Sequence, residues 1–397
     1  MINVFYKLFA RIYQGCFKLA IPILPYRNPI VYENVNEIKK ILSSEDKPLI
    51  VTDKVIISNG LLDYITKFLE ENHIVYSLFS DVCPNPTSLV VNEALAQFKK
   101  ENCNCFIAIG GGSVIDTAKA IGALYVRPKK TLRDLCGILH VRKRIPNLIA
   151  IPTTCGTGSE TTLATVVVDS ETRHKFAIND FPLIPRYAIL DYKMIESLPE
   201  SLIYATGLDA LTHDLEAYIG RSTTKQTRND ALEAIKLIFE NITLAKSREP
   251  KYLQNMLIAS HKAGRAFSKS YVGYVHAIAH SLGGKYNLPH GYANAVILPY
   301  VLREYDKAIY KKIAKIYDYV GMGDTSISNQ EKFTLFMDYL DKLEEQLNID
   351  KAINCIIESD IYGMAKYALK EANPLYPVPV MWDYKKMVSM YYKIQGK

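Results

Sequence analysis

The order of apolar and polar positions changes character about halfway along the chain. In the first half, short runs rich in β-branched residues, typical of buried strands, alternate with stretches whose apolar residues recur every three or four positions, typical of amphipathic helices. We expect helices within 61–73 and 92–102, and strands within 48–56, 74–79, 105–112, 147–154 and 187–191. Such alternation predicts a parallel sheet with helices on both faces.

The second half lacks strand-like runs after about residue 195. Long segments with helical periodicity replace them, among them 196–220, 226–245 and 251–271. We therefore predict an N-terminal extension, an α/β domain and an all-helical domain, over residues 1–28, 29–195 and 196–397. Since no repeat or low-complexity linker separates the halves, we expect them to pack closely around a cleft.

The N-terminal extension is apolar with scattered basic residues. Three of these interrupt the apolar run, namely Lys7, Arg11 and Lys18, and no small-residue cleavage site follows. Neither a signal peptide nor a membrane span fits this pattern. In a helix the basic residues share one face, largely opposite Phe5, Leu8, Phe9 and Ile12. Because amphipathic helices are usually core elements, we expect this one to pack on its own domain or on another subunit rather than on a membrane surface.

Composition and charge narrow the class of protein. The chain has 397 residues, of which 49% are hydrophobic, enough for a substantial core. Its net charge of +7 arises from acidic and basic residues mixed along the whole length, so we expect no nucleic-acid partner. The seven cysteines show no zinc-finger spacing, and reduced thiols in the cytoplasm are the simplest interpretation.

A glycine-rich turn follows the strand predicted to end near residue 109. In CFIAIGGGSVIDTAKAIGAL, three glycines and Ser113 lead directly into a helix. Glycines allow close backbone approach, and the unsatisfied N–H groups at a helix start attract an anion, so the turn suits a pyrophosphate. The spacing matches neither standard nucleotide-binding motif, which leaves a structural turn as the alternative, with Ser113 as the helix N-cap.

A second polar turn ends another predicted strand. The segment IPTTCGTGSETT, residues 151–162, supplies hydroxyl groups and two more glycines. At the carboxyl ends of parallel strands both turns face one crevice, which is where doubly wound sheets bind nucleotides. Asp53, which ends the strand-like PLIVTD, either accepts hydrogen bonds from a ribose or caps the next segment.

Acidic and histidine residues recur at helical spacing in the second half. Asp209 and His213 are four residues apart, as are His276 and His280, and His290 follows a Gly-Gly pair and a proline. Side chains four apart project from one face of a helix, and buried imidazoles need partners that one metal ion satisfies together. Mixed nitrogen and oxygen ligands suit Fe(II), Zn(II), Co(II) or Ni(II) rather than Mg(II) or Ca(II).

Phosphate-binding turns in one half and a metal cluster in the other indicate one kind of chemistry. A divalent ion can bind an alcohol oxygen and lower its pKa, while a nicotinamide ring accepts hydride from the same carbon. We therefore predict a metal- and nicotinamide-dependent oxidoreductase whose partner is a small-molecule alcohol or aldehyde.

Four segments resemble, in order and spacing, the signatures of the iron-containing (group III) alcohol dehydrogenase family. They are GGGSVIDTAKAIGAL, IPTTCGTGSE, ATGLDALTHDLEAYIG and VHAIAHSLGGKYNLPHGYANAVILPY, and the resemblance covers roughly residues 29–390. It implies an α/β dinucleotide-binding domain followed by an all-helical metal domain, and hydride transfer between NAD(H) and a primary alcohol or aldehyde. Fe(II) is the implied metal, with Zn(II) as the alternative. The resemblance also implies a homodimer whose subunits pair through an edge strand.

The resemblance also implies a role for each matching position. It implies a proton relay near the nicotinamide at His280, and metal ligands at Asp209, His213, His276 and His290. The implied cofactor contacts are Gly111, Gly112, Ser113, Thr153, Thr154, Thr162 and Lys175, with Asn85 and Asp53 near the adenosine. The charge of Asp53 would disfavour a 2′-phosphate, which favours NAD over NADP. Phe267 corresponds to an aromatic position facing the substrate, with core packing as the alternative.

Other interpretations stay open beside this one. Glycerol dehydrogenase-like and dehydroquinate synthase-like enzymes share the superfamily fold, but they resemble this chain less at DALTH, where His213 adds a ligand. A cofactor-binding scaffold without turnover is a second alternative, although every position expected for the chemistry is filled. Asp214, next to His213, either contacts an imidazole or faces solvent.

Overall fold

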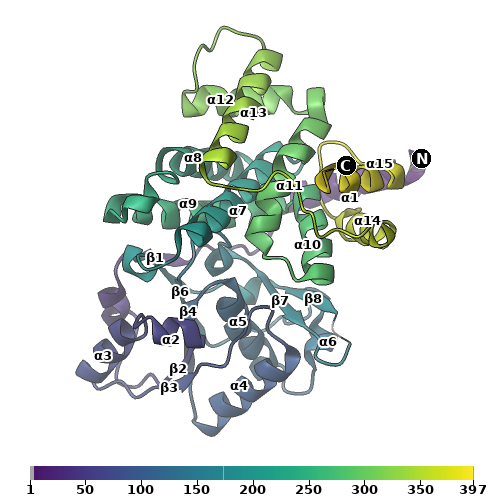
Figure 1. Cartoon of the computed structure of the whole chain (residues 1–397). Helices are drawn as coiled ribbons and strands as arrows, with labels where there is room; N and C mark the ends of the chain where they lie inside the picture. The colour runs from purple at the N-terminus through teal and green to yellow at the C-terminus, as the bar shows by residue number, and fades with distance from the viewer. Residues whose placement is uncertain (1–3, 173, 397) are drawn as a thin grey trace. The chain divides into compact units, whose positions relative to one another are not determined.

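The computed structural model describes residues 4–172 and 174–396, which fall into two compact units (Figure 1). The α/β unit contains Pro25–Pro199 and Arg248–Gly264. The helical unit contains the described residues up to Leu24, Glu200–Ser247 and those from Arg265 onward. Helix α9, Pro250–Ser270, therefore contributes residues to both units, although the sequence pattern places it among the helical segments.

A six-stranded, fully parallel sheet forms the centre of the α/β unit. Its spatial order is β1-β9-β6-β4-β2-β3. The strands are β1 Ile30–Tyr32, β2 Pro48–Val51, β3 Ser77–Phe79, β4 Cys105–Gly110, β6 Asn147–Pro152 and β9 Tyr187–Ile189. Each of the five predicted strand segments contains one of these strands, and β1 is the one that the sequence pattern did not indicate.

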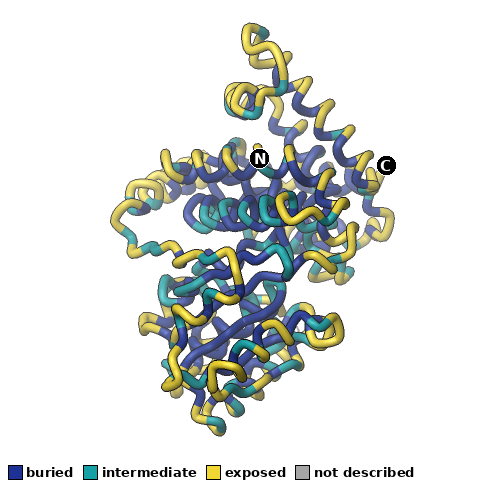
Figure 2. The backbone as a smooth tube through the Cα atoms, turned by 90° about the vertical axis from the view of Figure 1, so that its left-hand side faces the viewer, coloured by how far each residue is buried: buried dark blue, intermediate teal, exposed yellow. Residues whose placement is uncertain are grey.

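Both faces of this sheet are buried, which explains the nearly continuous apolar runs. In β4, Phe106 and Ala108 belong to one hydrophobic cluster, and Ile107 and Ile109 belong to the other. Successive side chains of a strand point to opposite faces, so each face needs its own helical cover. The helices of this unit are α2 Lys54–Ser58, α3 Asp63–Glu71, α4 Ser88–Lys100, α5 Gly112–Val126 and α6 Leu132–Leu135. Figure 2 shows the buried strands in dark blue at the centre of the unit.

A small second sheet was not indicated by the sequence pattern. It has the order β5-β8-β7, with β5 Gly137–Ile138 parallel to β8 Lys175–Asn179 and β7 Ala164–Val168 antiparallel to β8. The strand predicted within 48–56 is shorter than the apolar run suggested, because β2 ends at Val51. Asp53 caps α2 through hydrogen bonds from the Val55 and Ile56 N–H groups, so the apolar residues from 55 onward are helical.

The second unit is all helical among its described residues, as predicted. Its helices are α1 Val4–Ala20, α7 Glu200–Ile219, α8 Lys225–Asn241, α10 Tyr274–Tyr286, α11 His290–Tyr305, α12 Tyr310–Val320, α13 Asn329–Gln346, α14 Glu358–Ala372 and α15 Tyr384–Ile394. Capping boxes begin α8 at Thr224 and α13 at Ser328. Within the described parts of the chain, no helix is both long and apolar enough to cross a membrane. The predicted fold class is confirmed.

Helix α1 corrects one expectation about the N-terminal extension. We define its outer stripe as Phe5, Leu8, Phe9, Ile12 and Leu19, which are 79%, 58%, 56%, 57% and 80% exposed. Of the two protein surfaces expected for the apolar side, its own domain is therefore wrong, and another subunit stays a prediction. The physical reason lies on the opposite side, where polar groups of Arg11 and Gln14 find backbone carbonyl partners.

Candidate active site

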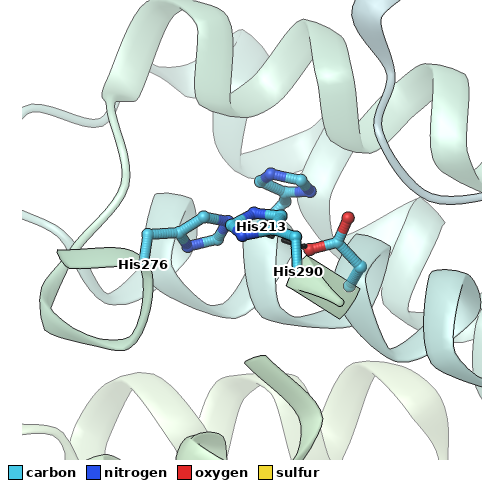
Figure 3. A group of neighbouring side chains, drawn as sticks. His213, His276 and His290 are labelled. Carbon is cyan, nitrogen blue, oxygen red and sulfur yellow. Dashed lines mark ion pairs between the residues drawn. The ribbon is translucent and has the colours of Figure 1, made fainter. Parts of the chain in front are cut away.

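Four predicted metal ligands meet in the helical unit. Helix α7 carries Asp209 and His213 one turn apart, α10 carries His276, and α11 begins at His290 directly after Pro289. One ligand atom from each lies within 4.8 Å of the others. Figure 3 shows the three histidines of this cluster side by side. Ligands about 2.0–2.2 Å from one ion lie about 3–4 Å apart, so the cluster is close to the spacing of a metal site.

His276 supplies the clearest test of whether a metal ion fits. Its ring is buried, and Nε2 has no hydrogen-bond partner among the described residues. This atom lies 4.0 Å from the Asp209 Oδ1. Burial, together with the neighbouring histidines, lowers the pKa of His276 well below its ordinary value, so the ring is neutral and can offer a lone pair. A divalent cation would satisfy this atom, and the residues present fit such an ion.

Glu216 holds the His276 ring in place, a role that sequence reasoning missed. Its carboxylate accepts hydrogen bonds from Nδ1 of His276 at 2.7 Å and from the N–H groups of Gly273 and Val275 at 2.6 and 2.8 Å. A Cβ at Gly273 would lie 2.6 Å from the Glu216 Oε1, so this close approach requires glycine. A carboxylate with two such donors is best satisfied by an Nδ1–H donor, which leaves Nε2 facing the cluster.

Asn294 is a second missed neighbour of the cluster. Its amide nitrogen donates to Oδ1 of Asp209 at 2.7 Å and lies 3.1 Å from Nε2 of His290. Asn294 is one helical turn after His290 on α11, but no spacing in the sequence links it to Asp209. It therefore helps to orient two of the predicted ligands.

Two residues next to His213 were considered in the sequence, Phe267 and Asp214. Phe267 stacks on the His213 ring, with centroids 4.0 Å apart and an interplanar angle of 12°, and it is only half-buried. Asp214 is fully buried, so the solvent-facing alternative is wrong. Neither of its carboxylate oxygens has a hydrogen-bond partner in the described residues, so the contact with an imidazole is not present either. Burial raises the pKa of Asp214 well above its ordinary value.

His280 lies beside the cluster without belonging to it. Its ring stacks on His290 with centroids 5.0 Å apart, and its side chain is one-third exposed. Its Nδ1 donates to Oε1 of Glu371 at 2.6 Å, and the Tyr376 hydroxyl donates to the same oxygen at 2.8 Å. Burial alone would raise the pKa of Glu371, but His280 and Tyr376 outweigh it and lower the pKa. Sequence reasoning did not identify Glu371 or Tyr376, since neither lies in a motif.

In the α/β unit, two predicted cofactor turns follow adjacent strands. Gly110 at the end of β4 pairs with Pro152 at the end of β6, and the Thr153 N–H donates to the Gly110 carbonyl at 3.1 Å. Gly111 is the N-cap of α5, where a Cβ would lie 3.3 Å from the Thr154 Cγ2. The Thr154 hydroxyl is buried without a hydrogen-bond partner among described atoms. An open helix start beside an unsatisfied hydroxyl fits a bound phosphate.

Two other residues of these turns lie differently from what the sequence suggested. Ser113 is not the N-cap, because α5 starts at Gly112 and Gly111 occupies the cap position. Thr162 is buried, and its Oγ1 accepts a hydrogen bond from the Lys119 Nζ at 2.9 Å. The side chain of Thr162 is therefore engaged inside the protein.

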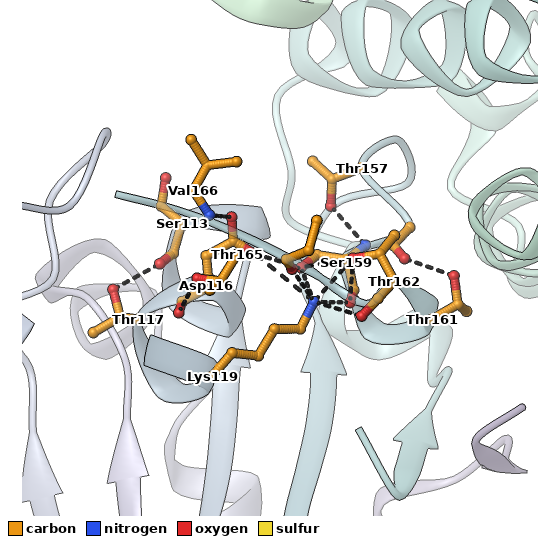
Figure 4. A network of polar contacts seen from close by, with 12 residues as sticks. Ser113, Asp116, Thr117, Lys119, Thr157, Ser159, Thr161, Thr162, Thr165 and Val166 are labelled. Atoms are coloured by element: carbon orange, nitrogen blue, oxygen red, sulfur yellow. Dashed lines mark hydrogen bonds and ion pairs between the residues drawn. The ribbon is translucent and has the colours of Figure 1, made fainter. Parts of the chain in front are cut away.

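Lys119 joins the two cofactor turns. Its ammonium is fully buried, and its three N–H groups share five acceptor oxygens of residues 159–164, at Nζ–O distances of 2.7–3.1 Å. Figure 4 shows this Nζ among Ser159 and Thr162, with Asp116 nearby. Burial lowers the pKa of Lys119 to about 8. The lysine lies in the same motif as the glycine turn, but its partners about 40 residues later could not be inferred from that motif.

The remaining predicted cofactor residues include one unexpected pair. The Lys175 ammonium donates to Oδ1 of Asn85 at 3.0 Å, although 90 residues separate them. Asn85 has a φ of 58° in a loop, which asparagine tolerates better than most residues. Asp53 fulfils the capping alternative, with Oδ1 accepting both cap hydrogen bonds.

These features place the chain among metal- and nicotinamide-dependent oxidoreductases, and comparison with known proteins gives the family. The chain belongs to the iron-containing alcohol dehydrogenase family. The family model for iron-containing alcohol dehydrogenase matches residues 29–192, and that for the C-terminal part of the Fe-containing alcohol dehydrogenase family matches residues 203–394.

Individual relatives cover nearly the whole chain. It is 35% identical to the 1,3-propanediol dehydrogenase of Citrobacter freundii over 363 residues, covering 90% of this chain and 93% of the relative. It is 34% identical to the NAD-dependent methanol dehydrogenase of Bacillus methanolicus, covering 82% and 86%. A crystal structure of a 1,3-propanediol oxidoreductase superposes with a TM-score of 0.89 at 32% identity, covering 93% of this chain and 99% of that one.

The comparisons confirm the predicted family, fold class and type of reaction. The protein is an oxidoreductase of the family that exchanges hydride between NAD(H) and an alcohol or aldehyde, with iron as the family's metal.

Proposed function

We propose that the chain interconverts a short primary alcohol or diol and its aldehyde with NAD(H), using a divalent metal ion held by Asp209, His213, His276 and His290. The observation that carries the ligand assignment is the buried Nε2 of His276, which has no hydrogen-bond partner in the described part of the chain and lies among the other three ligands. Fe(II) agrees with the family, and Zn(II) is the alternative for a mixed nitrogen and oxygen site. When bound, the metal supplies Lewis acidity to the substrate oxygen and the nicotinamide supplies or accepts the hydride.

The chain's own residues orient the ligands and move the proton. Glu216 fixes the tautomer and direction of the His276 ring. His280 takes up or returns the proton of the alcohol, because it is partly exposed and its Nε2 is opposite the nitrogen bound by Glu371. Glu371 and Tyr376 act as positioning residues that hold His280.

Cofactor binding belongs to the two turns of the α/β unit. We assign the pyrophosphate to the α5 start, with Gly111, Gly112 and Ser113 in its first turn and Thr153 and Thr154 beside it. Asn85 and Lys175 act as a pair near the ribose or adenosine. Thr162 supports the second turn through Lys119.

The preference for NAD over NADP is proposed to rest on the charge of Asp53. Asp53→Asn keeps a cap acceptor and removes the charge, so it should raise the efficiency with NADP relative to NAD. Measured kcat/KM values for both cofactors decide the point, and an unchanged ratio would remove Asp53 from the explanation.

For the substrate, the relatives' names favour a short chain. One is named for 1,3-propanediol and another for methanol. We propose short primary alcohols and diols as substrates of this chain, with Phe267 shaping the pocket from its position on His213. Comparing kcat/KM across methanol, longer alcohols and 1,3-propanediol ranks these candidates.

We also propose a cytoplasmic homodimer with domains divided near residues 28 and 195. The strand β1 is an edge of the large sheet, and its Ile30 and Val31 are exposed, which suits pairing with a second copy. The cysteines, all within the described residues, form no disulfide, as suits a reducing compartment. Sedimentation velocity tests the dimer.

The deciding experiment compares two histidine variants of protein purified without oxygen. His276→Ala should lose bound Fe(II) and turnover of short aldehydes with NADH. His140→Ala, in which the exposed side chain lies in the α/β unit, should keep both. Full metal content and full activity in His276→Ala would contradict the proposed site. Metal content is read independently of activity, so loss of iron and loss of catalysis are distinguished.

A further inference from the structure

Helix α1 is attached to the helical unit by polar groups. The Arg11 guanidinium donates to two backbone carbonyl oxygens of segment 374–379 at 2.8 and 3.1 Å, and the Gln14 amide donates to two others at 2.9 Å each. Gln14 is buried, and Phe17 packs on Tyr271 with ring centroids 4.9 Å apart. The helix is thus anchored by polar groups and Phe17, without the apolar side chains of the outer stripe.

Those apolar side chains form the outer stripe. Its members recur at spacings of three, four and seven residues, so they share one side of the helix. Tyr6, Phe9 and Tyr13 form a row of rings along its flank, with neighbouring centroids 6.5 Å apart. Tyrosine rings, which are apolar with a polar tip, suit the boundary between lipid and water. An exposed apolar patch of this size marks an interaction surface.

The family fold does not account for this stripe. The match to the iron-containing alcohol dehydrogenase model begins at residue 29, after α1 ends. The stripe therefore lies outside the part of the chain that the family model matches.

Charge distinguishes between possible occupants of the surface. No carboxylate precedes Glu33, whereas the segment before it contains Lys7, Arg11, Lys18 and Arg27. Lys7 and Lys18 are exposed. Two copies of α1 placed stripe to stripe would bring no opposite charges together, because the segment carries only basic charged residues. An anionic surface, in contrast, is complementary to the basic residues.

We propose that α1 seats the enzyme on the surface of an anionic lipid bilayer. The outer stripe enters the headgroup region along the membrane plane, while the positive charge on the other side of the helix attracts the anionic surface. The helix lies on the membrane and does not cross it. Seating by one such helix is reversible and sensitive to salt.

The test uses the full-length, metal-loaded protein with phosphatidylcholine vesicles, with and without phosphatidylglycerol. We expect the wild type to sediment with the anionic vesicles and to be released by salt. Phe5→Ser/Phe9→Ser/Ile12→Ser should lower the vesicle partition coefficient by at least about tenfold. Leu335→Ser/Ile357→Ser, which changes exposed apolar residues elsewhere in the same unit, should leave it unchanged.

Three results would overturn the proposal. The wild type could fail to bind either vesicle, or the control variant could lose binding as strongly as the stripe variant. The stripe variant could also bind the anionic vesicles as tightly as the wild type. If the wild type binds no vesicle and the stripe variant turns a dimer into monomers in sedimentation velocity, the stripe is a contact between subunits. Thermal unfolding and bound iron establish that each variant is folded.

Discussion

Replacing Glu216 with glutamine should weaken metal binding about 10- to 100-fold while leaving the protein folded. The Glu216 carboxylate is buried and accepts three hydrogen bonds, from the N–H groups of Gly273 and Val275 and from His276. Oε2 accepts two of them and Oε1 accepts the third. The residue therefore links the start of α10 to the direction of a metal-binding ring.

Glutamine has nearly the same shape but only one acceptor oxygen. If that oxygen takes the position that accepts from Gly273 and His276, the amide nitrogen meets the Val275 N–H. A buried donor is then left without a partner, at a cost of about 1–3 kcal/mol. That cost lowers the stability of the fold with or without metal. The loss of metal affinity, about 1.4–2.7 kcal/mol for 10- to 100-fold, follows instead from replacing the charged partner of His276 by a neutral one.

The assay is competition for Zn(II) or Co(II) between the metal-free protein and a chromophoric chelator. Glu344→Gln is the matched control, because Glu344 is also buried in the helical unit, where burial raises its pKa to about 9, but it lies outside the cluster. We expect the control to bind metal like the wild type. Glu216→Gln with metal affinity within about twofold of the wild type would refute the assigned role.

Three further predictions concern the proton path and the cofactor turns. Glu371→Gln should lower kcat about tenfold or more with metal content unchanged, because His280 loses its charged partner. Single-turnover NADH oxidation checks this, and an unchanged kcat would exclude Glu371 as a positioning residue for His280. Gly111→Ala should raise the NADH dissociation constant about tenfold, because the new Cβ lies 3.3 Å from Thr154 at the helix start; fluorescence titration with unchanged iron content checks it. Burial lowers the pKa of Lys119 from 10.5 to about 8. Between these two pH values the unfolded state binds more protons than the folded state. The free energy of unfolding of the wild type should therefore rise with pH in that window, relative to Lys119→Met. Urea unfolding at about pH 7.5 and about pH 9.5 would contradict this reasoning if the difference between the two proteins stayed constant.

Local periodicity in the sequence was enough to predict the fold class and much of the candidate site. Alternation of strand and helix patterns indicated the parallel sheet, since strands buried on both faces are continuously apolar. The four-residue spacings placed Asp209 with His213 and His276 with His280, because residues one helical turn apart share a face. The glycine turn marked the start of α5, although the N-cap is Gly111 rather than Ser113.

The contacts that support those residues were decided by the tertiary structure alone. Glu216 reaches Gly273 and His276 about 60 residues later, Lys119 reaches a turn about 40 residues away, and Glu371 meets His280 across 91 residues. A periodic pattern reports which face of its own element a residue occupies, but it carries no information on which element packs there.

For the N-terminal helix, too, the sequence pattern did not show which face packs on the protein. The sequence by itself determined that α1 is amphipathic, with basic and apolar sides. Only the tertiary structure decided that its polar side faces the protein, because backbone carbonyls of segment 374–379 lie within reach of Arg11 and Gln14. Unpaired carbonyl oxygens are costly to bury, so their demand for donors outweighs the usual rule that the apolar side turns inward.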